Sequence, residues 1–239
     1  MLELLIRDLR YGFRMLRKTP GFTLVALVTL ALGIGVNTAV FTVVNGLLLK
    51  PLPFPEPDRL ATVVSARRTP KGASENSSVD GKTFLAIRNG ATMVDVAVSS
   101  GGMGGGVNLF ANGAAASVEQ RRVSAGYFSV LGITPFLGRE FTADEDRQGG
   151  QPVAVLSYGV WTRVFGSDPT IVGQAIRLRG EPYTVVGVMP NGFTSGEPVD
   201  VWTPLRPSTS GEGGGTNYGM IARVRPGATW DQANAEINH

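Results

Sequence analysis

The stretch that decides the architecture is Gly21–Leu49, GFTLVALVTLALGIGVNTAVFTVVNGLLL, in which no residue is charged. As a helix it would be about 43 Å long, against about 30 Å for the hydrocarbon core of a bilayer. A cleaved signal peptide has a shorter apolar stretch followed by a small-x-small cleavage site, and this run ends in Leu-Leu-Leu-Lys-Pro instead. The sequence therefore predicts an uncleaved transmembrane helix over residues 21–49, with a buried helix of a soluble protein as the alternative.

Small residues recur at every fourth position within this span. Ala31, Gly35 and Ala39 would share one helix face and let a second helix approach closely. Asn37 and Asn45 add amide groups at a depth where an unpaired amide is costly. We therefore predict a helix-packing interface at Ala31, Gly35 and Ala39 in a multi-span or dimeric protein. The alternative is a lone anchor, because Gly and Ala are common in membrane helices.

Residues 1–20 carry the whole formal net charge of the chain, which is +3. The basic residues of this segment, set against only Glu3 and Asp8, are Arg7, Arg10, Arg14, Arg17 and Lys18. Apolar residues recur at spacings of three and four between them, which predicts an amphipathic helix on the membrane surface that breaks at Thr19-Pro20. By the positive-inside rule the N-terminus is cytoplasmic and residues 50–239 are extracytoplasmic.

The composition of the chain excludes several classes of function. The chain has no Cys and one His, so a disulfide framework, an iron–sulfur site, a cysteine nucleophile and a multi-histidine metal site are ruled out. Beyond Pro20 the positive and negative charges balance, whereas a nucleic-acid surface requires clustered Lys and Arg. We therefore expect no nucleic-acid partner.

Residues 50–239 indicate an α+β domain that follows a stiff, proline-rich exit from the span. The expected strands, rich in β-branched residues, are Leu60–Ala66, Met93–Ser99, Ser117–Ser124, Pro152–Ser157, Ala175–Arg179, Tyr183–Met189 and Met220–Val224. The expected helices are Val79–Arg88, Tyr127–Leu131, Tyr158–Phe165 and one that begins near Thr229, where Gln232 completes a capping box. The glycine-rich stretches Gly101–Gly106 and Gly211–Gly215 are expected to be loops.

Motifs that resemble nucleotide-binding or hydrolase signatures are incomplete. Gly81-Lys82-Thr83 matches the end of a phosphate loop, but Asn76 occupies the position of its first glycine. Ser157 follows an apolar strand without the glycine that a nucleophile elbow requires two residues earlier, so a helix N-cap is the favoured interpretation. The three tryptophans are expected in the core.

One dense acidic cluster consists of Glu140, Asp144, Glu145 and Asp146. Its spacing lacks the alternating pattern and turn glycine of a calcium loop, which favours a solvated loop over a metal or acid–base site. The sequence therefore predicts no catalytic, cofactor-binding or metal-ligating residue. A signal-anchored hydrolase is the weakest of the functional classes that we considered.

Several motifs in a fixed order carry a family resemblance. They are Asp8–Leu16 (DLRYGFRML), Pro20–Phe22, Val123–Ile133 (VSAGYFSVLGI), Leu137–Phe141 (LGREF), Val153–Tyr158 (VAVLSY), Trp161, Phe165–Gly173 (FGSDPTIVG), Tyr183–Pro190 (YTVVGVMP), Phe193 and Asp200–Leu205 (DVWTPL). Together they resemble the N-terminal portion of MacB-type ABC transporter permeases, including the MacB-like periplasmic core domain. The resemblance covers nearly the whole chain.

The resemblance implies a fold and a set of partners. It implies a cytoplasmic amphipathic helix (1–20), a transmembrane helix (21–49) and a periplasmic α+β core domain (50–239) with two subdomains, in the bacterial inner membrane. Three further spans and any ATPase motif are absent from the chain, so we expect it to be the front part of a longer permease.

Such a permease would have no enzymatic activity or cofactor of its own. It would couple ATP hydrolysis by a separate ATPase subunit to periplasmic movement and export. Its partners would be that subunit, a second permease protomer (homodimer or heterodimer), a periplasmic adaptor protein and membrane lipid. The alternative function is a membrane-anchored periplasmic binding or scaffold domain without transport activity. The sequence does not name a substrate.

Overall fold

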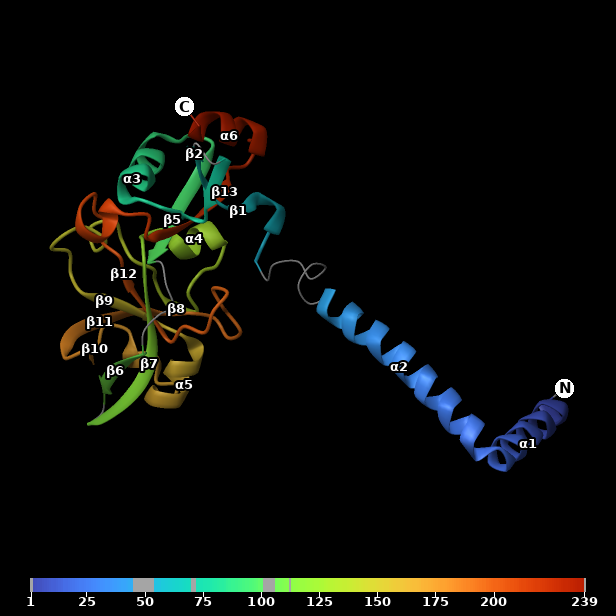
Figure 1. Cartoon of the computed structure of the whole chain (residues 1–239). Helices are drawn as coiled ribbons and strands as arrows, with labels where there is room; N and C mark the ends of the chain where they lie inside the picture. The colour runs from blue at the N-terminus through green and yellow to red at the C-terminus, as the bar shows by residue number, and fades with distance from the viewer. Residues whose placement is uncertain (1, 45–53, 70–71, 101–105, 112, 239) are drawn as a thin grey trace. The chain divides into compact units, whose positions relative to one another are not determined.

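A computed structural model describes residues 2–44, 54–69, 72–100, 106–111 and 113–238 (Figure 1). The chain divides into two compact units, Met1–Pro53 and Phe54–His239. The described residues of the first unit are almost entirely helical, and the second unit contains sheet and helix, so the fold class is α+β as the sequence predicts. We describe each unit by itself.

The helices of the first unit are α1 (Leu2–Lys18) and α2 (Pro20–Val44), and the break between them has a local cause. Pro20 has no N–H to donate to the carbonyl of Leu16, four residues earlier. The hydroxyl of Thr23 donates to that carbonyl instead, at 2.8 Å. Proline is also favoured in the first turn of a helix, which suits the start of α2.

Helix α2 is long and apolar enough to cross a membrane, at about 37 Å for its 25 residues, and none of its Pro20–Thr42 stretch is buried within the chain. Its polar side chains bond to their own helix. Asn37 Nδ2 donates to the carbonyl of Gly33 at 2.9 Å, and Thr29 donates to that of Val25 at 2.9 Å. This arrangement satisfies polar groups that lipid could not. The predicted span residues 45–49 lie outside the described part of the chain.

The second unit alternates short strands and helices. Its strands are β1 (Leu60–Thr62), β2 (Ser65–Thr69), β3 (Gly72–Asn76), β4 (Ser78–Val79), β5 (Val94–Ser100), β6 (Gly106–Ala111), β7 (Ala114–Val123), β8 (Leu137–Gly138), β9 (Val153–Leu156), β10 (Ala175–Leu178), β11 (Glu181–Val188), β12 (Val201–Pro204) and β13 (Tyr218–Val224). Its α-helices are α3 (Gly81–Gly90), α4 (Tyr127–Leu131), α5 (Tyr158–Phe165) and α6 (Trp230–Ile237). Short 3₁₀ turns are η2 (Pro57–Arg59), η3 (Pro169–Ile171) and η4 (Gly211–Gly214).

The main sheet is 11-stranded and partly closed on itself. Its main path is β1-β13-β5-β7-β12-β9-β11-β10-β6, and beside it β4 pairs with β13 and β8 with β11. Strand β6 pairs again with β7, so the strands from β7 to β6 form a ring. The long strand β7 connects the ring to the open part of the sheet formed by β5, β13 and β1. It pairs with β6 along most of its length and with β5 at Val123. Figure 1 shows β7 running from the ring toward α4, with α5 beside the ring.

Three clusters of buried side chains form the core of the second unit. The first is built by the ring strands and α5, the second packs α4 against β9 and β12, and the third packs β5 and β13 against α3 and α6. Strand β9 serves two of them, because Ala154 and Leu156 belong to the first cluster while Val153 and Val155 belong to the second. A strand buried on both faces has no polar alternation, which is why its sequence is a continuous apolar run.

Helix boundaries in the second unit follow the sequence closely. Helices α4 and α5 have the predicted bounds, and Thr229 and Gln232 form the predicted capping box at the start of α6. The prediction of loops in the glycine-rich stretches is wrong in part. Gly106 begins β6, and Gly211–Gly214 form a 3₁₀ turn with Gly213 buried. Residues 101–105 lie outside the described part of the chain.

Candidate functional site

Residues 55–59, which we call the linker, form hydrogen bonds with β13 and α6, the last strand and the last helix of the second unit. Arg223 Nη2 donates to the carbonyl of Pro55 at 3.0 Å, and Trp230 Nε1 donates to that of Asp58 at 2.9 Å. In the reverse direction, Arg59 Nε and Nη2 donate to the carbonyl of Val224 at 2.9 and 2.7 Å. We call Arg59, Arg223 and Trp230 the linker clamp.

Arg223 is the buried member of the clamp, with 8% of its surface exposed on β13. Its Nε donates to the carbonyl of Val130 in α4 at 2.5 Å, so one guanidinium joins the linker to that helix. The cation lies at the C-terminal turn of α4, where the helix dipole favours positive charge. Burial, and then the neighbouring Arg59, lower the pKa of the Arg223 guanidinium.

Arg59 is itself a residue of the linker and pairs with another linker residue. Its Nη1 forms an ion pair with Glu56 at 2.7 Å, and Glu56 has a left-handed backbone with φ of 47°. Such a conformation is uncommon for a residue other than glycine and fixes a sharp change of chain direction. Residues 55–59 are thus bonded to β13 and α6, and Arg223 connects them to α4. A displacement of the linker would act directly on these elements.

The small residues of the predicted helix-packing interface lie on α2. Ala31, Gly35 and Ala39 are exposed, and a Cβ added at Gly35 would meet no described atom within 4 Å. No described residue of the first unit buries this face, and the interface stays a prediction.

The expectation of a solvated acidic loop is wrong for Asp146. Its side chain is 4% exposed and accepts from the backbone N–H groups of Ala125 at 2.8 Å and Arg206 at 2.7 Å. Burial raises the pKa of this carboxyl, and the two N–H donors partly offset the effect. The neighbouring Glu145 instead pairs with Arg139 at 2.7 Å. The cluster therefore ties loops together, and no group of three or more His, Cys, Asp or Glu in the described chain could hold a metal ion.

The motif residues examined for chemistry have structural roles. Ser157 Oγ accepts from the N–H of Val160 at 3.1 Å, which confirms it as the N-cap of α5. Gly81 begins α3 where a Cβ would collide with the carbonyl oxygen of Ser208, so the backbone leaves no room for a side chain there. Trp161 and Trp202 are buried in the core, as predicted, whereas Trp230 is only partly buried against the third cluster.

The linker clamp is missing from the sequence prediction. Arg223 stands within the predicted strand Met220–Val224, and the signal is a single charged residue in an otherwise apolar strand. Its acceptors are backbone carbonyls near Pro55 and Val130, which residue types do not reveal. Only the fold brings these segments together.

A membrane-length apolar helix followed by an α+β domain is the arrangement of a membrane-anchored domain. The family model that matches is the MacB-like periplasmic core domain, over residues 23–239. The chain belongs to this family.

Curated relatives share part of this domain. A probable export ATP-binding/permease protein MacB of Pseudomonas entomophila (strain L48) is 30% identical over 127 residues, which cover 52% of this chain and 19% of the relative. A probable syringafactin export ATP-binding/permease protein SyfD of Pseudomonas syringae pv. syringae (strain B728a) is 34% identical over 110 residues, which cover 44% and 16%. The matched region is thus less than a fifth of each relative's length.

A solved structure shares the fold. The periplasmic region of MacB from Actinobacillus actinomycetemcomitans superposes with a TM-score of 0.52 and 17% sequence identity, over 66% of this chain and 71% of that one. At this identity the likeness concerns the fold alone.

Proposed function

We propose that this chain is the N-terminal part of an ABC exporter permease that couples ATP hydrolysis by an ATPase subunit to conformational change in its periplasmic domain. The observation that carries the proposal is the linker clamp, because it bonds residues 55–59, at the start of the second unit, to β13 and α6 and, through Arg223, to α4. The family membership and the printed names of the relatives, which are export ATP-binding/permease proteins, support the same role.

The physical basis of the proposed coupling is the set of hydrogen bonds that the clamp makes at residues 55–59. A helix transmits displacement along its axis, and the clamp bonds the linker to a β-strand and two helices. Arg223 is central, because moving Pro55 would strain its bond to Val130 at the same time. A displacement of Pro55 would then act on β13 and α4 together.

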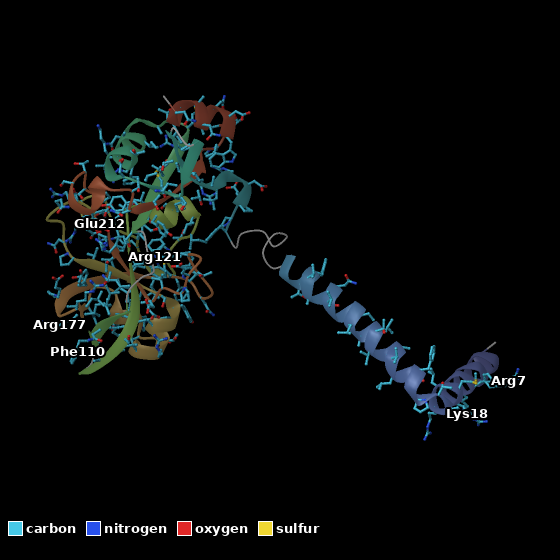
Figure 2. All side chains as sticks on the ribbon, in the orientation of Figure 1. Arg7, Lys18, Phe110, Arg121, Arg177 and Glu212 are labelled. Carbon is cyan, nitrogen blue, oxygen red and sulfur yellow. The ribbon has the colours of Figure 1, made fainter. Side chains whose placement is uncertain are left out.

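The membrane arrangement is part of the proposal. Residues 1–20 lie on the cytoplasmic surface, residues 21–49 cross the inner membrane, and residues 50–239 are periplasmic. The basic residues of α1, of which Arg7 and Lys18 are labelled in Figure 2, support this orientation by the positive-inside rule. They also suit anionic lipid headgroups.

The proposed partners follow from this arrangement. A second permease protomer packs on the face formed by Ala31, Gly35 and Ala39, because small residues allow close helix contact. An ATPase subunit supplies the hydrolysis, in keeping with the ATP-binding role in the printed names of the relatives. A periplasmic adaptor protein completes the export path.

Copurification from the native host tests this function against a scaffold domain that acts alone. The tagged full chain is solubilised in dodecyl maltoside, purified and assayed for vanadate-sensitive ATP hydrolysis. We expect hydrolysis to copurify with the chain. In the matched control, an unrelated single-span anchor replaces residues 1–49, and we expect the activity to be lost. A wild-type eluate without ATPase activity would support the scaffold instead.

A further inference from the structure

The outer face of the ring carries a row of exposed residues that crosses four strands. Arg177 on β10 is the register partner of Phe110 on β6 and of Pro182 on β11. Phe110 is in turn the register partner of Ala115 on β7. All four residues are exposed, whereas the alternate residues of β6 and β10 are buried in the first core cluster. Figure 2 labels Phe110 and Arg177 close together on the second unit.

An open recess of about 550 Å³ lies on this face, where β6 meets β10. Its lining includes Phe110, Arg177 and Arg179 and, among the described residues, no acidic side chain. Phe110 is 52% exposed, although phenylalanine is most often buried. Neither arginine takes part in the ion pairs of the described chain. The recess thus joins an exposed aromatic ring to two cations without a paired carboxylate.

One of these arginines has a strained backbone. Arg179 and Gly180 form the two-residue turn between β10 and β11, which the register pair of Leu178 and Glu181 closes. Both turn residues have positive φ, 53° for Arg179 and 84° for Gly180. Turns of this kind favour asparagine, aspartate or glycine, so an arginine there costs free energy. The N–H of Arg179 donates to the carbonyl of Asn108 at 3.1 Å, which holds the turn against β6.

The two arginines have the spacing of alternate residues in an extended chain. Arg177 and Arg179 are two residues apart and both line the recess, so their Cα atoms are about 6–7 Å from each other. An extended partner segment places its own alternate side chains at the same interval. Acidic residues at positions i and i+2 can therefore meet both guanidinium groups, while an apolar side chain of the same segment packs on Phe110.

The segment would lie on the face of the sheet. Strand β6 pairs with both β7 and β10, and β10 pairs with both β6 and β11, so neither strand has a free edge. The contacts would therefore be made by side chains, and addition of the segment as a further strand is excluded at this place.

We propose that the surface formed by Phe110, Arg177 and Arg179, which we call the arginine face, docks an extended acidic segment of a partner protein. Charge complementarity selects the acidic partner, because charge-assisted hydrogen bonds from arginine to carboxylate are strong. The exposed ring favours a polypeptide over a simple anion, which would use the arginines alone. Arginine and aromatic residues are also enriched in protein interfaces. This surface does not rest on the proposed transport function.

Contact quenching tests the arginine face on the full chain in dodecyl maltoside. Ser117 is exposed beside the recess, because its Oγ would lie 3.5 Å from a Cβ added at Gly106. The chain has no cysteine, so Ser117→Cys can carry a single bimane label. The probe is the blocked peptide Asp-Thr-Asp-Thr-Trp, whose indole quenches bimane on contact. We expect saturable quenching below millimolar peptide, but none with Asn-Thr-Asn-Thr-Trp.

A second label position shows whether the quenching is local. Ala235 is exposed on α6, whose buried residue belongs to the third core cluster and not to the ring. Bimane at Ala235→Cys should keep its fluorescence over the same peptide range. Binding of the peptide to the detergent micelle would act on both labels and on both peptides alike.

Matched variants measure the contribution of each side chain. Arg177→Gln and Arg179→Asn should each weaken the peptide about threefold, and together about tenfold. Arg147→Gln is the control, because it removes the same charge from an exposed arginine outside the recess and should leave the affinity unchanged. Phe110→Thr should also weaken binding. Arg179→Asn should at the same time raise the thermal unfolding midpoint, since asparagine suits positive φ, which separates lost binding from lost folding.

Four outcomes would overturn the proposal. They are a label at Ser117→Cys that millimolar acidic peptide does not quench, equal quenching by the amide peptide, an equal loss of affinity in Arg147→Gln, and an affinity that Phe110→Thr leaves unchanged. The last outcome would reduce the arginine face to a site for simple anions. The first two outcomes require no change at Phe110 or at the arginines.

Discussion

Arg223 Nη2 lies 3.0 Å from the carbonyl oxygen of Pro55, although 168 residues separate the two in sequence. The same guanidinium reaches Val130 of α4 through its Nε. One buried side chain thus joins the linker that follows the span, the strand β13 and the helix α4. The connection uses charge-assisted bonds to carbonyls, which are stronger than bonds between neutral groups.

Replacing Arg223 by methionine should lower the free energy of unfolding of the second unit by about 2–4 kcal/mol, because the buried carbonyl of Val130 and the carbonyl of Pro55 lose a charged donor. Urea denaturation of the full chain in detergent, followed by tryptophan fluorescence, measures the loss. Arg225→Met is the control, since Arg225 is exposed and pairs with Asp95 at 2.7 Å. It should cost less than about 1 kcal/mol. Equal losses of unfolding free energy in the two variants would show that Arg223 stabilises the second unit no more than an exposed arginine does.

Local signals made part of this fold predictable. Helices α4 and α5 are bounded by Gly126, Gly132, Ser157 and Gly166, whose capping roles are visible in the sequence. Strand β6, by contrast, follows a glycine-rich run, and its partners β7 and β10 decide that it is a strand. Its alternating burial arises from ring closure, which no local pattern encodes.

The candidate site was less predictable than the fold for the same reason. A charged residue in an apolar strand, such as Arg223, marks a position of interest but does not name its partners. The carbonyls that it contacts belong to every residue type equally. Asp146 shows the converse case, because its acidic neighbours suggested solvent exposure, whereas the fold places it among backbone N–H donors.

Two glycines of α3 should respond to alanine in opposite ways. At Gly81 a Cβ would collide with the carbonyl oxygen of Ser208, whereas at Gly90 it would meet nothing within 4 Å. We expect Gly81→Ala to destabilise by about 1–3 kcal/mol through overpacking. Gly90→Ala should stabilise by up to about 1 kcal/mol, because alanine loses less backbone freedom in a helix. Thermal unfolding of the two variants and the wild type measures these changes in stability. A Gly81→Ala variant more stable than the wild type would contradict the close contact between Gly81 and Ser208.

Acid should weaken the 139–146 region through Glu145. Hydrogen bonding from Arg139 lowers the pKa of this carboxyl below its ordinary value of 4.5. A lowered pKa in the folded state contributes stability above the unfolded-state pKa, and this contribution is lost as the pH falls through the lowered value. The advantage of the wild type over Arg139→Gln should therefore be largest near neutral pH and shrink below about pH 4.5.

Urea midpoints from pH 7 to pH 3 measure this difference. The buried Asp146 acts in the opposite direction, because its raised pKa makes protonation in acid favour the folded state. Since Asp146 is present in both proteins, the comparison isolates the pair of Arg139 and Glu145. A difference that grows toward acid would refute the assignment.

The packing face of α2 can be tested because the chain has no cysteine of its own. Ala39→Cys then reports close contact between two copies through disulfide formation in the membrane. Gly35→Leu should reduce this cross-linking, since a bulky side chain four residues earlier on the same face holds the helices apart. Gly33→Leu is the matched control, because position 33 lies about 200° around the helix from position 35. The thermal unfolding of the second unit should be the same in both variants, which separates assembly from folding. If both leucines reduce cross-linking equally, the contact does not use the face of Ala31, Gly35 and Ala39.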